Sequence, residues 1–411
     1  MTLDHVIGLK CMKCGKELAP SHSDYTCDSC GTPGILDVLY DYRLLRARVA
    51  RDRLAGSGVW RYLPFLPVAP DAPEPCLEVG ATPLYHPARL CRELDFPGLY
   101  VKDDGRNPTA SLKDRASTVG IARAVAAGAR TITAASTGNA ACSLAGLTAA
   151  AGIPCTIFVP KRAPRPKVAQ LLVFGAKVFQ VEGTYEQCFD LSVEASRRFG
   201  WYNRNCGYNP YLVEGKKTVG FEIAEQLGWQ TPDRVYVSVG DGCIISGVYK
   251  AFYDLKAVGW LDRIPRLVAV QAEGASPVAT AFRQNRPIEP VEPQTIADSI
   301  ACGIPRNGLK ALRALRESDG RAVTVSDAEI LGAMSRLAGS AGVFGEPAGV
   351  TAFAGFLKDL ASGDLPSGER AVVLVTGNGL KDIESAFKAV GEPLRVEPSM
   401  AAVEKLVGAN A

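Results

Sequence analysis

The sequence predicts an α/β protein with mostly parallel sheets, and three observations support this class. Short apolar segments, such as 99–104 (LYVKDD), 155–160 (CTIFVP), 234–240 (RVYVSVG) and 371–377 (AVVLVTG), alternate with Ala- and Leu-rich stretches of helical length. This alternation is typical of parallel strands joined by crossover helices. Many of the apolar segments end in Gly, Ser, Thr, Asn or Asp, and ligands in such folds bind at the carboxyl ends of strands. The length of 411 residues suits two or three domains.

The bulk composition excludes several function classes. Hydrophobic residues make up 47% of the chain and charged residues 22%, as in ordinary globular proteins. The net charge of +3 is too small to indicate a nucleic-acid or membrane partner. No apolar run reaches the length of a membrane span, and the start MTLDHVIGLK does not resemble a signal peptide. We therefore expect a cytoplasmic protein that binds neither nucleic acid nor membrane.

Histidines are scarce: the chain contains only His5, His22 and His86. None of them lies in a motif typical of nucleophilic catalysis. Acid–base chemistry is therefore expected to depend on another group, and lysine is the obvious candidate.

Two Cys-x-x-Cys pairs lie near the N-terminus. Cys11 and Cys14 are separated from Cys27 and Cys30 by twelve residues, and a glycine follows each pair. Four such sulfurs can surround one Zn²⁺ tetrahedrally, and no further ligand is in sight, so the spacing predicts a closed, structural zinc ribbon. The alternative is four free or disulfide-bonded cysteines.

The segment 102–117 places a lysine at a helix start. A strand ends near Lys102, a turn at Asn107-Pro108 follows, and either Thr109 or Ser111 is expected to cap the next helix. Lys113 then lies at the helix N-terminus, where the dipole disfavours a cation and favours the neutral amine. That amine is the form that reacts with a carbonyl. The alternative is an ordinary surface lysine.

Three further strand-end segments carry polar groups. Residues 136–139 (Ser-Thr-Gly-Asn) precede an Ala-rich helix and could bind a carboxylate, although taken alone they read as an ordinary helix cap. Residues 240–244 (Gly-Asp-Gly-Cys-Ile) form a glycine turn that could cradle a phosphate, yet they lack both the dinucleotide and the P-loop spacing. Thr376 follows another strand and could place a hydroxyl at a ligand's edge.

Together these segments resemble the threonine synthase family of fold-type II pyridoxal-phosphate (PLP) enzymes, including its N-terminal zinc ribbon. The matching segments span most of the chain: CMKCG (11–15), YTCDSCG (25–31), GILDVLYD (34–41), GATPLYH (80–86), NPTASLKDRAS (107–117), ASTGNAA (135–141), YNPYLVEGKKTVGFEIAEQL (208–227), VGDGC (239–243), EPAG (346–349) and VTGNGLKD (375–382). The implied fold is tryptophan synthase β-like, with two doubly wound parallel-sheet domains and a small N-terminal zinc ribbon. A homodimer is also implied.

The resemblance assigns roles by position. It implies that Lys113 is the Schiff-base lysine and proton shuttle, and that Asn139 hydrogen-bonds the ring hydroxyl of the cofactor. The loop Ser136, Thr137 and Gly138 is implied to bind the substrate carboxylate. The implied phosphate loop is Gly240, Asp241, Gly242, Cys243 and Ile244, with Thr376 as partner of the pyridine nitrogen. A neutral hydroxyl there favours elimination and replacement over transamination.

The sequence departs from the family where the substrate phosphate is held. Threonine synthases usually have Asn-Ser and an arginine before the EGxKT motif, and this chain has Cys206, Gly207 and Leu212 at those places. A leucine cannot form the bidentate fork that arginine offers a phosphate. Arg204 or Lys216 could substitute, but neither is at a matching position.

The predicted function is a PLP-dependent elimination or replacement on an amino acid, with threonine synthase first: O-phosphohomoserine and water give L-threonine and phosphate. A β-replacing synthase on an activated serine or threonine (cysteate- or cysteine-synthase-like) and a threonine or serine ammonia-lyase stay open. A rival from another class is a zinc-ribbon regulatory protein on an inactive PLP scaffold. Intact Lys113 argues against that rival.

The expected domain division follows from composition and from the resemblance. Residues 1–45 form the ribbon, and 46–75 is a connection that ends in the Pro-rich PVAPDAPEP. Residues 46–118 and 226–395 are expected to form the large PLP domain, 119–225 the smaller one, and 396–411 a C-terminal tail.

Overall fold

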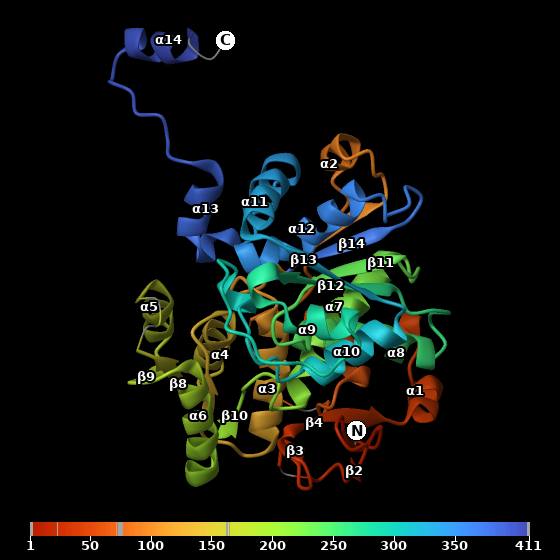
Figure 1. The fold of residues 1–411 in the computed structure, drawn as a ribbon. Coiled ribbons are helices and arrows are strands. Elements are labelled where there is room, and N and C mark those ends of the chain that lie inside the picture. The colour runs from red at the N-terminus through yellow and green to blue at the C-terminus, as the bar shows by residue number, and fades with distance from the viewer. Residues whose placement is uncertain are drawn as a thin grey trace.

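A computed structural model of the chain describes residues 3–22, 24–70, 72, 77–161, 163 and 165–408 (Figure 1). Three sheets organise the molecule, two of them parallel or nearly so. Helices pack against these two sheets, and the N-terminal sheet lies beside the body that they form (Figure 1). The predicted α/β class is therefore confirmed.

The N-terminal sheet is antiparallel, with strand order β2-β1-β4-β3. Its strands are β1 (Val6–Cys11), β2 (Glu17–Leu18), β3 (Thr26–Cys27) and β4 (Gly31–Tyr40). Helix α1 (Tyr42–Arg48) follows, and the Asp41 side chain caps it by accepting from the N–H groups of Arg43 and Leu44.

The smaller parallel sheet has the order β10-β7-β8-β9. Its strands are β7 (Ile132–Ala135), β8 (Cys155–Pro160), β9 (Lys177–Val181) and β10 (Tyr202–Asn203), and the helices between or before them are α3 (Lys113–Ala126), α4 (Asn139–Ala150), α5 (Arg165–Val173) and α6 (Tyr185–Phe199). Helix α6 begins with a capping box between Thr184 and Gln187 and ends at Gly200.

The larger sheet has the order β13-β12-β11-β14-β6-β5, and only the β5–β6 pair is antiparallel. Its strands are β5 (Leu84–Tyr85), β6 (Leu99–Asp103), β11 (Arg234–Ser238), β12 (Arg266–Ala272), β13 (Arg321–Val325) and β14 (Ala371–Val375). Every residue of β11 and β14 is buried, as expected for central parallel strands covered on both faces.

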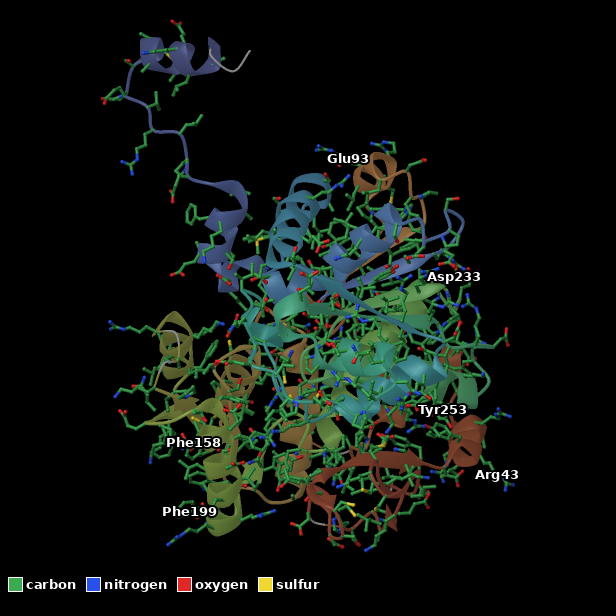
Figure 2. All side chains as sticks on the ribbon, viewed as in Figure 1. Arg43, Glu93, Phe158, Phe199, Asp233 and Tyr253 are labelled. Atoms are coloured by element: carbon green, nitrogen blue, oxygen red, sulfur yellow. The ribbon has the colours of Figure 1, made fainter. Side chains whose placement is uncertain are left out.

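The remaining helices cover this larger sheet or extend from it: α2 (Ala88–Glu93), α7 (Tyr211–Gln226), α8 (Cys243–Ala257), α9 (Pro277–Arg283), α10 (Gly308–Glu317), α11 (Asp327–Ala341), α12 (Pro347–Ala361), α13 (Ile383–Val390) and α14 (Met400–Gly408). Short 3₁₀ helices span Arg51–Arg53, Gly58–Phe65, Asp104–Arg106, Glu273–Ala275, Asp298–Ile300 and Gly379–Lys381. Side chains fill the space between sheets and helices, whereas α14 projects away from the body (Figure 2).

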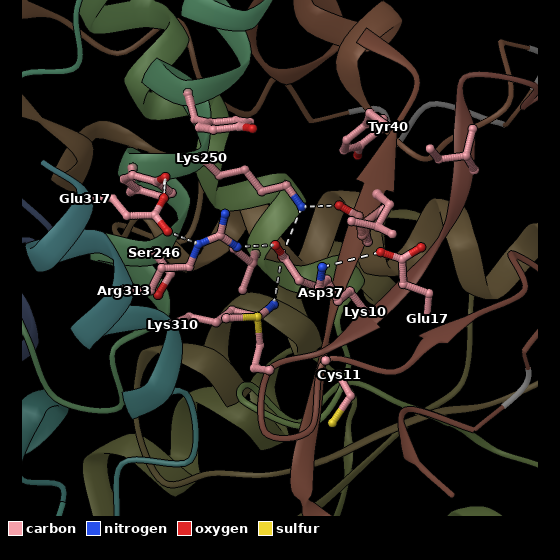
Figure 3. Close-up of a pocket in the computed structure, with 18 of the residues that line it drawn as sticks. Lys10, Cys11, Glu17, Asp37, Tyr40, Ser246, Lys250, Lys310, Arg313 and Glu317 are labelled. Atoms are coloured by element: carbon pink, nitrogen blue, oxygen red, sulfur yellow. Dashed lines mark hydrogen bonds and ion pairs between the residues drawn. The ribbon is translucent and has the colours of Figure 1, made fainter. Parts of the chain in front are cut away.

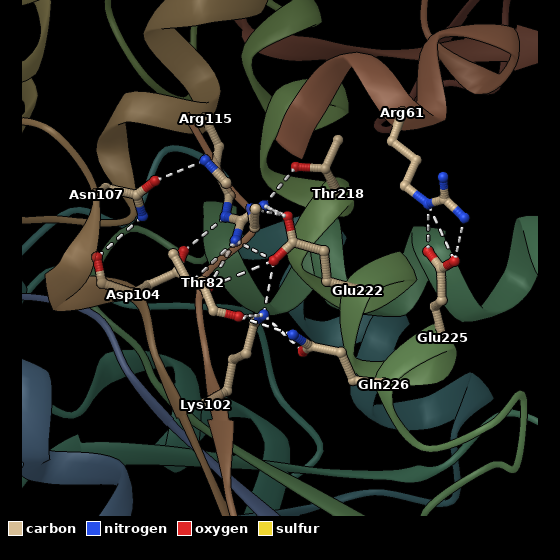
Figure 4. Close-up of polar contacts among 12 residues, drawn as sticks. Arg61, Thr82, Lys102, Asp104, Asn107, Arg115, Thr218, Glu222, Glu225 and Gln226 are labelled. Carbon is tan, nitrogen blue, oxygen red and sulfur yellow. Dashed lines mark hydrogen bonds and ion pairs between the residues drawn. The ribbon is translucent and has the colours of Figure 1, made fainter. Parts of the chain in front are cut away.

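A buried ion-pair network joins three of these elements (Figure 4). Arg115 of α3 bonds Asp104 after β6 at 2.6 Å and Glu222 of α7 at 2.7 Å, and Lys102 of β6 also pairs with Glu222 at 2.6 Å. All four side chains are at most 5% exposed, so each charge depends on its partners for solvation. Because Arg115 is two residues after Lys113, the network holds the start of α3 against β6 and α7.

Within the described residues, no helix combines the length and the apolar character that crossing a membrane requires.

Candidate active site

Three strand-end loops meet at one edge of the larger sheet. β11, β14 and β6 are parallel neighbours, so the loops at 240–244, at 376–378 and at 107–113 start from the same side. The N–H of Leu112 donates to the carbonyl of Thr376 at 3.0 Å, and the N–H of Asn378 donates to the carbonyl of Ala110 at 3.0 Å. The topology thus brings together segments that are more than 250 residues apart in the chain.

Lys113 is the first residue of α3, as expected from the sequence. Burial lowers the pKa of its amine, and the nearby Lys216 lowers that pKa further, whereas negative charge on Cys206 and on Glu346 raises it. In the part of the chain that the structure describes, Nζ has no hydrogen-bond or ion-pair partner. A desolvated, unpaired amine at a helix N-terminus is suited to react as the neutral base.

The expected cap of this helix is wrong. Residue Leu112 occupies the cap position without a side-chain bond. Asp114 instead reaches back to accept the N–H of Thr109 at 2.7 Å and also bonds the Thr109 hydroxyl. The Ser111 hydroxyl is fully buried and has no partner among the described residues, so it is left to bond a ligand.

Asn139 begins α4 and hydrogen-bonds Glu346, which lies just before α12. Burial raises the pKa of Glu346, and the N–H of Glu346 donates to the carbonyl of Gly377 at 3.1 Å. A Cβ at Gly377 would lie 2.2 Å from the Glu346 carboxyl and 3.1 Å from the Asn139 amide. The small sheet is thereby connected to the loop that carries Thr376.

The loop of Ser136, Thr137 and Gly138 lies between β7 and α4 and is partly exposed. The Ser136 hydroxyl accepts the N–H of Gly138 at 3.2 Å. A pocket of about 340 Å³ opens beside Gly138 and Asn139, and Thr109, Cys142 and Lys381 also line it. The loop is therefore accessible to a small ligand next to the N-terminus of α4.

The loop 240–244 leads into the 15-residue helix α8. None of its five N–H groups donates to another described residue. The first N–H groups of a helix have no acceptor within the helix, so these groups are available to donate to a ligand. Gly242 has φ +90°, and a Cβ there would lie 2.9 Å from Ala311 and 3.0 Å from the carbonyl of Asn307. The glycine is thus needed for both conformation and space.

The carboxylate of Asp241 is bonded to other groups and not to these N–H groups. Its carboxylate accepts the N–H of Arg306 at 2.6 Å and the thiol of Cys243 at 3.1 Å. Burial raises the pKa of Asp241 to about 6. The hydroxyl of Thr376, 6% exposed, has no partner among the described residues and is free to bond a ring nitrogen.

Four residues of this region were missed or left unassigned by sequence reasoning: Glu346, Arg204, Cys206 and Lys216. Arg204 donates to the Cys206 sulfur at 3.0 Å and to the carbonyl of Lys113 at 3.3 Å, and Lys216 Nζ lies 3.5 Å from the same sulfur. The Glu-Pro start of α12 was a visible signal for Glu346. No sequence signal showed that the other three converge beside Lys113.

The four N-terminal cysteines come together. Their sulfurs all lie within 4.8 Å of one another, and the sulfurs of Cys14 and Cys27 are 3.8 Å apart. A tetrahedral Zn²⁺ with bonds of about 2.3 Å places its sulfurs about 3.8 Å apart. The glycines after the pairs, Gly15 and Gly31, have positive φ, which makes the tight knuckles possible. The cluster has the geometry of a metal site, far from Lys113 in sequence.

Comparison with known proteins agrees with this site. Residues 76–377 match the family described as pyridoxal-phosphate dependent enzyme. The chain is 40% identical to the threonine synthase of Methanocaldococcus jannaschii over 403 residues, which is 97% of this chain and 98% of that protein. It is 38% identical to the threonine synthase of Methanosarcina acetivorans over 97% of this chain and 98% of that one, and 37% identical to that of Mycobacterium tuberculosis over 83% and 93%.

Solved structures show the same fold at lower identity. Tomato (Solanum lycopersicum) threonine deaminase isoform 2 superposes with a TM-score of 0.66 at 20% identity, covering 75% of this chain and 87% of that chain. Maize serine racemase superposes with a TM-score of 0.65 at 21% identity, covering 80% and 94%. The strand-end site, the matched family and the near full-length identities lead to one conclusion: the chain belongs to the pyridoxal-phosphate-dependent enzymes, in the threonine synthase family.

Proposed function

We propose that this chain is a threonine synthase, which converts O-phosphohomoserine and water to L-threonine and phosphate. The observation that carries the proposal is the desolvated and unpaired amine of Lys113, at the meeting point of the loops that match the family. The 40% identity to a threonine synthase over nearly the full length of both chains supports the same reaction.

The described residues fit pyridoxal phosphate. The free N–H groups of 240–244 suit its phosphate, Lys113 its carbonyl, Asn139 its ring hydroxyl and Thr376 its pyridine nitrogen. When bound, the cofactor supplies a ring that draws electrons from the substrate's α-carbon. Because Thr376 is a neutral hydroxyl, it leaves the ring nitrogen without the full charge that a carboxylate partner would stabilise.

The remaining steps belong to the protein's own groups. Ser136, Thr137 and Gly138, at the N-terminus of α4, bind the substrate α-carboxylate through N–H and hydroxyl donors. Lys113 Nζ, as the neutral amine, would remove the proton from the α-carbon and return a proton later. A proton then leaves the β-carbon as phosphate departs from the γ-carbon. The γ-carbon takes up a proton to become the methyl group, the hydroxyl of a water molecule adds at the β-carbon, and a proton returns to the α-carbon, which completes threonine.

A second candidate is favoured by one specific observation. Leu212 is fully buried and packs against Gly120, so it offers no donor where threonine synthases usually have an arginine. An elimination or replacement on an activated serine or threonine, or deamination of threonine or serine, would not need that arginine.

The deciding experiment supplies purified enzyme and added cofactor with O-phosphohomoserine, O-phosphoserine, serine and threonine in separate assays. Threonine and phosphate formed from O-phosphohomoserine support the proposal. Release of a 2-oxo acid from threonine or serine, with O-phosphohomoserine untouched, assigns ammonia-lyase activity instead. A protein that stays colourless with added cofactor and converts none of the four fits the regulatory rival.

We further propose that Cys11, Cys14, Cys27 and Cys30 bind one structural Zn²⁺, for which the 3.8 Å sulfur separation is the support.

We also propose a homodimer. The C-terminal segment after α13, residues 391–408, exposes the apolar side chains of Leu394, Val396, Met400 and Val407. This exposure supports burial of the segment in an assembly. Light scattering of the full chain and of a chain ending at Gly391 tests this, with a dimer expected for the full chain.

The domain boundaries are proposed as expected from the sequence: a ribbon at 1–45, a large PLP domain at 46–118 and 226–395, a smaller one at 119–225 and a tail at 396–411. The division of the strands among the sheets supports it. Strands β1 to β4 form the N-terminal sheet, β7 to β10, between residues 132 and 203, form the smaller parallel sheet, and β5, β6 and β11 to β14 form the large sheet. Limited proteolysis, with cleavage expected first near 391–399, tests the last boundary.

A further inference from the structure

Apart from Lys113, two buried basic side chains lack a carboxylate partner in the part of the chain that the structure describes. Eight other Lys and Arg residues are buried there, and six of them pair with a carboxylate: Lys102, Arg115, Lys217, Arg234, Lys250 and Lys310. Arg204 is 1% exposed and Lys216 is fully buried, yet each bonds only neutral oxygens and the sulfur of Cys206. A buried charge without a counterion is costly, so the pair is suited to an anion that arrives from outside.

Both cations lie inside the candidate active site. Arg204, just after β10, also donates to the carbonyl of Lys113 at 3.3 Å. Lys216 lies on α7, which packs so closely against α8 that a Cβ at Gly247 would lie 2.9 Å from the Lys216 Cβ. The sulfur on which both converge interacts in turn with Cys243 of the loop 240–244.

The local groups do not neutralise this pair. Cys206 supplies at most one negative charge, and its interaction with Cys243, followed by the charges of Lys216 and Arg204, lowers the pKa of its thiol despite burial. Asp241 is the nearby carboxyl, and it is occupied by the N–H of Arg306 and the thiol of Cys243. At least one positive charge therefore remains for a ligand.

The position of Lys216 relates it to the missing arginine. Leu212 and Lys216 are one helical turn apart on the same face of α7, and Lys216 Nζ lies 3.4 Å from the carbonyl of Leu212. The cation that threonine synthases usually have at the place of Leu212 is thus found one turn later, on the same side of the helix.

We propose that Arg204 and Lys216 form the subsite that binds the phosphate of the substrate, in place of the missing arginine. This inference rests on the proposed function, because it names the residues that select a phosphorylated amino acid over a neutral one. Arg204 offers a guanidinium fork and Lys216 a point charge, so together they reach different oxygens of one phosphate.

The test uses the holoenzyme, in which the cofactor already fills the 240–244 loop, and titrates inorganic phosphate by calorimetry. The variant Lys216→Gln is expected to weaken phosphate binding about 10- to 100-fold, as for loss of a charged hydrogen bond. Lys256→Gln, which removes an exposed lysine from the end of α8, serves as the charge-loss control and is expected to bind phosphate as the wild type does.

Two further variants separate the explanations. Cys206→Ser is expected to keep or strengthen phosphate binding, because a competing negative charge is gone. Arg204→Lys, which retains charge but loses the fork, is expected to bind phosphate more weakly than the wild type. Thermal melts and the visible absorbance of bound cofactor show whether each variant folds and is loaded.

Three results would overturn the inference. One is unchanged phosphate binding in Lys216→Gln holoenzyme. Another is a Lys216→Gln variant whose holoenzyme binds inorganic phosphate as the wild type does while its apoenzyme takes up the cofactor more weakly. That result would assign Lys216 to the cofactor's own phosphate. The third is loss of phosphate binding in folded Cys206→Ser.

Steady-state kinetics distinguish this inference from the proposed function. With O-phosphohomoserine, Lys216→Gln is expected to raise KM about 10-fold or more, and the double variant Leu212→Arg/Lys216→Gln to recover part of the loss if it folds. If the wild type does not convert O-phosphohomoserine but phosphate binding still depends on Lys216, the proposed reaction fails and the anion subsite stands.

Discussion

At the scale of single residues, chemistry here depends on which charges lack partners. Among the residues that the structure describes, none accepts a hydrogen bond from the Lys113 amine, whereas the Lys102 amine donates to Glu222, Gln226 and the carbonyl of Thr82. Both lysines are desolvated, so burial lowers the pKa of each. Only Lys113 is left free to react, and this difference separates a catalytic lysine from a structural one.

Replacement of Lys113 by alanine is expected to lower turnover by about 10³-fold or more, because both the attachment point and the proton carrier are lost. The measurement is initial rate with O-phosphohomoserine, together with visible absorbance before and after borohydride. The exposed Lys256→Ala is the control. Full activity in folded Lys113→Ala would contradict the assignment.

At the scale of elements, one buried carboxylate helps to hold the N-terminal sheet to the body, beside apolar packing and the bond from Tyr40 to Glu214 at 2.6 Å. Asp37 of β4 forms ion pairs with Lys250 at 3.0 Å, Lys310 at 3.1 Å and Arg313 at 3.5 Å (Figure 3). These side chains line a pocket of about 580 Å³ between the sheet and helices α8 and α10. Although burial alone would raise it, these cations hold the pKa of Asp37 well below its usual range.

Asp37→Asn is expected to lower the free energy of unfolding by about 3 kcal/mol, because it leaves the buried ammonium of Lys310 without a carboxylate and takes one of two carboxylates from Lys250. The matched control is Glu17→Gln, which removes an exposed carboxylate of the same sheet that pairs with Lys10 (Figure 3). That change is expected to cost less than about 1 kcal/mol. Urea titrations measure both, and equal effects would show that Asp37 does not hold the sheet.

The cysteine cluster belongs to the same element. Metal analysis is expected to find about one zinc per chain, and Cys14→Ser to lose it, since a serine hydroxyl is a poor zinc ligand. Cys14 is exposed, so the change opens no cavity in the core. Cys91→Ala, outside the cluster, is expected to retain the metal. Full zinc content in Cys14→Ser would exclude a four-cysteine site.

At the scale of the whole molecule, acid sensitivity is expected from the network of Figure 4. Burial alone would raise the pKa of Glu222, but Arg115 and Lys102 lower it to about 2, from 4.5 for a free glutamate. A depressed pKa adds stability that is complete above the unfolded value and is lost as pH falls toward the folded one. The contribution therefore disappears between about pH 4.5 and pH 2.

The free energy of unfolding is expected to fall by roughly 3 kcal/mol more in the wild type than in Glu222→Gln as the pH decreases over that window. The variant begins less stable, since Arg115 and Lys102 lose a carboxylate. Urea titrations at several pH values give both slopes. Parallel slopes would show that Glu222 titrates normally in the folded state.

Much of the fold followed from local patterns. The strands before residues 107, 136, 240 and 376 and the helices that begin at Lys113, Asn139 and Cys243 lie where hydrophobic alternation and glycine turns predicted them. The cap of α3 was not predicted correctly. The Asp114 side chain accepts from the N–H of Thr109 across the turn, and this side-chain-to-backbone bond competes with capping by Thr109 or Ser111. The domain boundaries and the site roles stay predictions.

By itself, the sequence determined the α/β class, the position of Lys113 at a helix start and the family, because strand, helix and turn preferences act over a few residues. Only the tertiary structure decided that Arg204, Cys206 and Lys216 converge beside Lys113 and that no carboxylate of the described residues bonds Arg204 or Lys216. The physical reason is that desolvation and charge pairing depend on what packs nearby in space. These neighbours come from the segment after β10 and from α7, whereas Lys113 begins α3, and the chain order alone does not place these segments together.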